Sequence, residues 1–197
     1  GTEHLVVATA NGVAKRLTLD EVQATRNGRQ LLKLRAGDRV VAAFTAPGGV
    51  DLVIVASDGQ ALRTPVDSVS VQGRGAAGVA GMKLKGGAVV IGAAAIDGDD
   101  TLITVTDSGG VKATPTSELE SRGRGGIGVR VSKLADGSSV STAHVGPPIG
   151  LLAIMGTDED PRKPDPVPVP LMLESTRRDL VSSTSERQIL AIGPARW

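Results

Sequence analysis

Three stretches of the chain share one order of apolar and polar positions. Each opens with an apolar, β-branched run: LVVATANG from residue 5, LVIVASDG from residue 52 and LITVTDSGG from residue 102. A polar turn ending in glycine follows, at Gly12, Gly59 and Gly109, and a second short apolar stretch comes after it. Asn-Gly and Asp-Gly, present in the first two turns, tolerate positive φ and suit the twist of paired strands. The pattern therefore predicts three β-hairpins.

The segments after these hairpins repeat as well, in a glycine-rich form that we call the corner segments. They are NGRQLLKL (27–34), GRGAAGVAGMKL (73–84) and GRGGIGVRVSKL (123–134). Positions that recur at steps of 50 are Gly28, Gly78 and Gly128, and Leu34, Leu84 and Leu134. A glycine turn and another strand-like run follow each leucine, so each copy holds four strands. Such a period favours a propeller-like array of small sheets, with a β-sandwich as the alternative.

The last fifty residues form a degenerate fourth copy. LLAIM, from Leu151, has the character of a first strand, but five prolines between Pro161 and Pro170 replace the hairpin. Proline removes hydrogen-bond donors and favours extended conformations, which predicts a long loop there. We expect one domain over residues 1–197, with repeats at about 5–50, 51–100, 101–148 and 149–197.

Composition narrows the possible chemistry. The chain has no cysteine, two distant histidines (His4 and His144) and two aromatic residues (Phe44 and Trp197). A disulfide framework, a cysteine-ligated zinc site and thiol catalysis are therefore excluded. The carboxylates recur in turns, and the common catalytic motifs are missing. We expect no catalytic residues, no metal and no cofactor. No apolar run approaches the length of a membrane span, so we expect a cytoplasmic protein without membrane contact.

Charge is informative only in its arrangement, because 22 basic residues balance 21 acidic ones. One basic set follows the hairpin turns: Lys15 and Arg16, Arg63, and Lys112. A second set lies in or beside the corner segments: Arg26 and Arg29, Arg74, and Arg122 and Arg124, extended by Lys83, Lys85, Arg130 and Lys133. If the corners lie on an outer rim, these cations form a belt suited to duplex DNA phosphates. The scarcity of aromatic residues argues against single-strand binding. The alternative is that the charges serve only solubility.

The motifs resemble a known family. Thr9 to Leu17 (TANGVAKRL), Ser57 to Thr64 (SDGQALRT) and the corner segments at 73–84 and 124–129 are similar to the C-terminal repeats of bacterial type IIA topoisomerase A subunits, those of DNA gyrase and topoisomerase IV. The resemblance covers roughly residues 5 to 148. Gyrase carries a box of the form Q-[RK]-R-G-G-[RK]-G. The nearest match, Ser121 to Gly128, lacks the glutamine and has Ile127 where the second basic residue belongs.

The resemblance implies an all-β fold, a propeller-like β-pinwheel of about four four-stranded blades, whose basic rim bends duplex DNA for strand passage. It also implies that the domain is non-catalytic, since strand breakage belongs to a tyrosine of an N-terminal core and this chain has none. The parent would be an ATP-dependent type IIA DNA topoisomerase, either gyrase or topoisomerase IV.

The resemblance also implies partners, and the recurring basic residues supply the candidate contacts. The partners are double-stranded DNA, the ATPase subunit and the breakage–reunion core that shares a chain with these repeats, in a nucleoid-associated location. We expect the isolated domain to be a monomer. The alternative function is a protein-interaction scaffold without DNA binding. The predicted phosphate contacts are Lys15, Arg16, Arg29, Arg63, Arg74, Lys112, Arg122 and Arg124.

Overall fold

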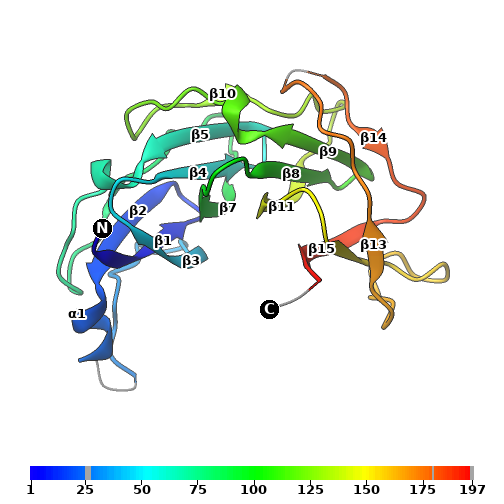
Figure 1. The fold of residues 1–197 in the computed structure, drawn as a ribbon. Coiled ribbons are helices and arrows are strands. Elements are labelled where there is room, and N and C mark those ends of the chain that lie inside the picture. The colour runs from blue at the N-terminus through cyan, green and yellow to red at the C-terminus, as the bar shows by residue number, and fades with distance from the viewer. Residues whose placement is uncertain (25–27, 179, 196–197) are drawn as a thin grey trace.

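The strands of this chain form four antiparallel sheets, or blades, side by side in an open arc (Figure 1). The computed structural model describes residues 1–24, 28–178 and 180–195. Blade 1 contains β3 (Val40–Pro47), β1 (Glu3–Thr9), β2 (Val13–Thr18) and β6 (Val79–Ala80). Blade 2 contains β10 (Val129–Arg130), β5 (Gln60–Pro65), β4 (Asp51–Ala56) and β7 (Val90–Ala95). Blade 3 contains β11 (Val140–Gly146), β8 (Thr101–Thr106), β9 (Gly110–Pro115) and β14 (Ser183–Thr184). Blade 4 contains β13 (Val169–Leu171), β12 (Leu151–Met155) and β15 (Ile189–Pro194).

The predicted hairpins and the propeller-like architecture are confirmed. β1 pairs with β2 around the turn at Gly12, and β4 with β5 and β8 with β9 repeat the arrangement. The inner strands β3, β7, β11 and β15 contact one another in turn along the inside of the arc (Figure 1). Four blades therefore pack face to face in succession, whereas a sandwich has only two packed sheets.

The outermost strand of a blade comes from the following repeat, which the sequence pattern did not predict. Val79–Ala80 pairs with Val13–Ala14 of blade 1, and Val129–Arg130 pairs with Gln60–Ala61 of blade 2. These two-residue strands lie in the corner segments, whose glycines hide their strand character. Sequence repeats and sheets are thus offset, and blade 4 has three strands among the described residues.

Gly128 shows why the corner segments need glycine. Its φ is +84°, and a Cβ there would overlap the backbone carbonyl of Ala61 in β5, the strand that pairs with β10. A side chain would force the donated strand away from β5, so this glycine serves strand exchange between repeats.

The interior consists of small aliphatic side chains between blades. Val6 and Ala14 of blade 1 pack against Leu52 and Ile54 of blade 2. Val53 of blade 2 packs with Leu102 of blade 3 in the next interface. The alternation along each first strand therefore covers both faces of the inner blades, as expected for a sheet between two others.

Short helical turns follow the second strands. They are α1 (Leu19–Gln23) and the 3₁₀ turns η1 (Val66–Ser68) and η2 (Thr116–Glu118). The hydroxyl of Thr18 caps α1 by accepting a hydrogen bond from the Glu21 N–H at 3.3 Å. Val22 of α1 packs on the buried side chains of Leu17 and Leu32, so α1 and the first corner segment cover the outer face of blade 1.

Candidate nucleic-acid interface

Lys15 lies in the interior, which corrects its prediction as a phosphate contact. Its side chain is 0% exposed, and its ammonium donates to the carbonyls of Leu31 at 2.8 Å and of Arg74 and Ala76 at 3.0 Å. These carbonyls belong to the first and second corner segments. The ammonium therefore links the first and second corner segments from the interior side, and it is not accessible at the surface.

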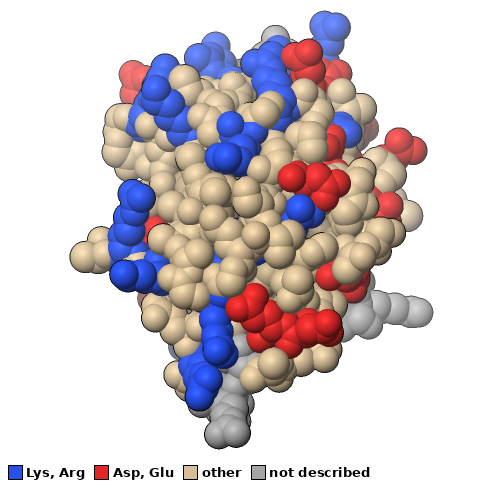
Figure 2. Space-filling model, turned by 90° about the vertical axis from the view of Figure 1, so that its left-hand side faces the viewer, with Lys and Arg blue, Asp and Glu red and all other residues tan. Residues whose placement is uncertain are grey.

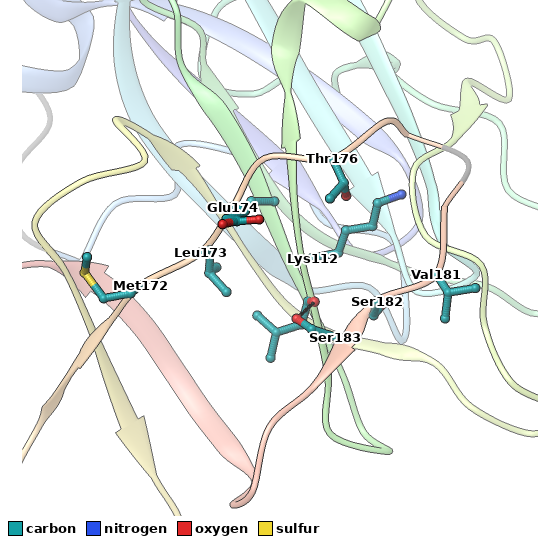
Figure 3. A pocket seen from close by; sticks show the side chains of 10 residues that line it. Lys112, Met172, Leu173, Glu174, Thr176, Val181, Ser182 and Ser183 are labelled. Carbon is teal, nitrogen blue, oxygen red and sulfur yellow. Dashed lines mark hydrogen bonds between the residues drawn. The ribbon is translucent and has the colours of Figure 1, made fainter.

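Lys112, the corresponding residue of blade 3, is also buried, at 2% exposure. Its ammonium donates to the carbonyls of Arg178 at 2.6 Å and Leu180 at 2.9 Å. Figure 3 shows the side chain extending from β9 toward the segment that carries Thr176 and Val181, in a cavity of about 430 Å³. This prediction is corrected as well, because the ammonium organises the segment that covers β9.

Arg16 and Arg63 tie consecutive blades together. Arg16, 8% exposed, pairs with Asp67 of η1 at 2.5 Å. Arg63 pairs with Asp51 at 2.7 Å and donates to the carbonyl of Thr116 in η2 at 3.1 Å. Each arginine thus reaches the turn of the next repeat. Carboxylates of the domain itself compensate both charges, which corrects the prediction of these arginines as phosphate contacts.

Replacing Lys15 by methionine should destabilise the domain by about 2 to 3 kcal/mol, because three carbonyl acceptors lose their donor while the side-chain volume is kept. Burial lowers the pKa of Lys15, an effect that the carboxylate of Glu21 partly offsets. Urea denaturation measures the loss. Lys33→Met, at an exposed position, should change stability by less than about 0.5 kcal/mol. Equal effects of the two substitutions would contradict the structural role of Lys15.

The arginines of the corner segments lie toward the surface. Arg29 is exposed and Arg74 is half buried, with its backbone N–H donating to Glu21 at 2.8 Å. The Arg124 guanidinium donates to the carbonyls of Ser68 at 2.8 Å and Ala80 at 3.1 Å, while the residue remains exposed. Arg122 pairs with Glu120 at 2.9 Å, and both side chains are exposed, so the pair is weak and separable. Arg26 lies outside the described residues.

A regular row of lysines was absent from the predicted phosphate contacts, although two of its members, Lys83 and Lys133, belong to the predicted basic belt. Lys33, Lys83 and Lys133 are exposed and recur at steps of 50. The backbone N–H of Lys83 donates to the carbonyl of Gly126 at 2.8 Å, and that of Lys33 to Ala76 at 3.4 Å, so each corner is bonded to the next. The fixed step before Leu34, Leu84 and Leu134 was the signal that could have identified the row.

The row lies at one end of the strands. Met82 and Ser132, which precede two of the lysines, donate to the turn glycines Gly12 at 3.0 Å and Gly59 at 3.4 Å. Acidic residues concentrate at the opposite ends, in the crossover and 3₁₀ turns: Asp51, Asp67, Asp97, Asp99, Asp100, Glu118 and Glu120. On the side shown in Figure 2, Lys and Arg gather along the top and one margin, and Asp and Glu on the other half. Asp38, Asp58, Asp107 and Asp136 lie in turns at the lysine end, so the near-neutral chain has an uneven distribution of charge without a complete separation of the two signs.

Comparison with known proteins gives a direct assignment. The family model described as the DNA gyrase C-terminal domain, beta-propeller, matches residues 3–47, 51–97 and 100–146. The chain belongs to this gyrase C-terminal domain family. Blades 1 to 3 correspond to the three matched repeats, while blade 4 falls outside them.

Relatives of this gyrase-type domain include whole subunits and separate domains. The DNA gyrase A subunit of Aminobacterium colombiense is 39% identical over 83 residues, and that of Deinococcus deserti is 41% identical over 85 residues. These matches cover 42% and 39% of this chain and 10% of each relative. The fold matches the C-terminal domain of DNA topoisomerase IV (TM-score 0.82, 22% identity, 99% of this chain and 63% of that one). It also matches a DNA gyrase A C-terminal domain (TM-score 0.77, 20% identity, 97% and 65%).

The two histidines of the gyrase-type domain are far apart in the chain, and burial lowers the pKa of His144, partly offset by Asp100. Within residues 1–24, 28–178 and 180–195, no three His, Cys, Asp or Glu side chains are grouped to hold a metal ion. Over the same residues, no helix has the length and apolar character needed to cross a membrane.

Asp107 should make stability of the gyrase-type domain depend on acid pH. The hydroxyls of Ser138 and Ser139 donate to its carboxylate at 2.6 and 2.8 Å, and the Ser139 N–H at 3.0 Å. These bonds, that of Ser138 first, lower the pKa of Asp107 below 3.8. Stabilisation is complete above pH 3.8 and is lost as the pH falls toward the folded-state pKa. Asp107→Ala should lower the Tm by a few degrees at pH 7 and by less below pH 3.8. Asp136→Ala, in the loop that carries Ser138 and Ser139, should not lower it. A constant difference between wild type and Asp107→Ala at all pH values would contradict this assignment.

Proposed function

We propose that this domain binds duplex DNA along its outer rim and bends it, without catalysing a reaction itself. The observation that carries the proposal is the row of Lys33, Lys83 and Lys133, one per repeat, on corners that are hydrogen-bonded to one another. Phosphates recur regularly along a duplex, so a regularly spaced row of cations on a curved rim can follow them without reading bases.

The proposed contacts combine the lysine row with the corner arginines that remain accessible. The set is Lys33, Lys83 and Lys133 together with Arg29, Arg74, Arg122 and Arg124. Bending a site of a few helical turns costs about 1 to 6 kcal/mol, so several of these contacts must act together. The buried cations contribute indirectly, since Lys15 holds two corners in place.

The wider role is also a proposal, because the chain spans about a tenth of the length of its gyrase relatives. In the bacterial nucleoid, the bent duplex would be offered to the breakage–reunion core of a gyrase-type or topoisomerase IV-type enzyme that works with an ATPase subunit. In such a DNA topoisomerase, this domain would hold and bend the duplex, and the core would break and rejoin it.

Fluorescence anisotropy with a duplex of several helical turns tests DNA binding. If five to seven cations each neutralise one phosphate, log K should fall with log salt with a slope between about −4.5 and −6.3. End-to-end energy transfer on the same duplex should rise on binding if the DNA bends. The alternative function, a protein-interaction scaffold, predicts no salt-dependent DNA affinity, and that result would overturn the proposal.

A further inference from the structure

The segment 176–185 (TRRDLVSSTS) lies along β9 of blade 3 as the second and third corner segments lie along β2 and β5. Where each segment begins, a backbone N–H donates to a carbonyl of the strand at 2.9 Å: Gln72 to Arg16, Arg122 to Arg63, and Thr176 to Ala113. Where it ends, an N–H donates to the glycine of the hairpin turn at 2.8 to 2.9 Å: Gly81 to Gly12, Val131 to Gly59, and Ser185 to Gly109. Residues 176–185 therefore align without a gap with 72–81 and 122–131, and we call them the fourth corner segment.

The buried lysines support this alignment. Each ammonium donates to the carbonyls at the same two aligned positions: Lys15 to Arg74 and Ala76, and Lys112 to Arg178 and Leu180. Figure 3 shows the Lys112 side chain extending from β9 toward the fourth corner segment. The same cation–carbonyl contact thus holds a corner segment against blade 1 and against blade 3.

The close contact between corner segment and strand also recurs, with the glycine on the other side. Gly78 has a φ of +86°, and a Cβ there would overlap the Val13 side chain in β2. In blade 3, Ser182 aligns with Gly78, and Gly110 takes the place of Val13 in the strand register. A Cβ on Gly110 would lie 3.1 Å from that of Ser182. The fourth corner segment has no glycine of its own, so the repeat pattern of the sequence does not reveal it.

Arg178 is the cation that this alignment selects. It takes the position of Arg74 and Arg124, so blades 1, 2 and 3 each carry one arginine at the same point of the outer edge. The residue is half buried, as Arg74 is. Among the described residues, the Arg178 guanidinium has no hydrogen bond or ion pair, and it is therefore available to an external anion.

The lysine row, in contrast, does not continue into the fourth repeat. Beyond the corner segment, a carbonyl at the start of the inner strand accepts an N–H from the hairpin turn: Val89 from Ser57, Ser139 from Asp107, and Gln188 from Gly156. Residues 82–88 and 132–138, which carry the row lysines, lead up to this carbonyl in the second and third repeats, but only 186–187 do so in the fourth. Arg187 pairs there with Asp165 at 3.1 Å, so its charge is compensated.

We infer that Arg178 contacts a DNA phosphate and carries the duplex path along the outer edge of blade 3, an inference that rests on the proposed function. A guanidinium binds a phosphate through charge-assisted hydrogen bonds, and its repetition from blade to blade suits the repetition of phosphates along a duplex. The sequence predicted Lys112 as the contact of this blade. Lys112 instead binds the backbone of the fourth corner segment from the interior, and Arg178 provides the positive charge at the edge.

Fluorescence anisotropy of the whole chain with a bendable duplex tests this contact. Arg178→Ala should reduce the magnitude of the salt slope by about 0.9 and weaken binding at low salt roughly fivefold. Arg178→Lys keeps the charge and should keep the slope. Arg177→Ala is the matched control, because it removes the same charge from an exposed neighbour that aligns with glycine in the other corner segments. It should change binding less than about twofold, through long-range electrostatics.

The thermal stability of these variants separates contact from folding. Lys112 binds the carbonyl of residue 178 and not its side chain, so all three variants should melt within about 2 °C of the wild type. A wild type whose DNA affinity does not depend on salt would overturn both the proposed function and this inference. If the wild type binds with a steep slope, an unchanged slope in Arg178→Ala, or an equal loss in Arg177→Ala, would overturn the role of Arg178 alone.

Discussion

A triple variant with Lys33, Lys83 and Lys133 replaced by alanine should bind a bendable duplex with a salt slope smaller in magnitude by about 2.7, since each lost phosphate contact removes about 0.9. The affinity at low salt should fall roughly a hundredfold or more. The three side chains are exposed, so the fold should be retained, which circular dichroism can verify.

A matched variant separates the row from net charge. Arg162, Lys163 and Arg177 are exposed in the proline-rich region and in the segment that follows β13. Replacing these three residues by alanine removes the same charge away from the proposed path. Binding should then change by less than about threefold, through long-range electrostatics alone. Equal losses in the two triple variants would show that the position of the lysines does not matter.

Gly128→Ala should destabilise the domain by more than about 4 kcal/mol, the largest effect on stability that we expect from a single methyl group. Its φ of +84° disfavours any side chain, and the added Cβ would overlap the backbone of Ala61, which cannot move without opening β5. Urea denaturation at neutral pH measures the loss.

Gly137→Ala is the control for backbone strain alone. Its φ is +75°, but nothing lies within 4 Å of a Cβ at this position. The expected loss is about 1 to 2 kcal/mol, from the left-handed conformation. If both substitutions cost the same, close contact between repeats is not what Gly128 provides, and strand exchange contributes little to stability.

Much of the architecture could be predicted because it repeats. The turns at Gly12, Gly59 and Gly109 and the step of 50 in the corner segments specify hairpins, their number and their order. Strand exchange could not be predicted, since Val79–Ala80 is too short and too rich in flanking glycine to indicate a strand.

The contact residues were only partly predictable. Lys15 and Lys33 look alike in the sequence, yet one is enclosed by carbonyls from residues 31, 74 and 76, and the other is exposed. Those carbonyls come together only in the folded chain. Periodicity distinguishes the two lysines better than proximity to a turn does, because Lys33 recurs at steps of 50 whereas Leu62 replaces the lysine in blade 2.

The donation of each outer strand by the next repeat gives the chain a direction during synthesis. When a ribosome has released blade 1 alone, β2 still has an open edge, and that edge is covered only after residues 79 and 80 emerge. In the same way, the edge of β5 stays open until residues 129 and 130 are synthesised, and that of β9 until residues 183 and 184 are. Each unfinished edge is a site where a nascent chain can pair with the wrong strand. The proline-rich outer edge of blade 4 is the only one of the four, among the described residues, that needs no later segment to protect it.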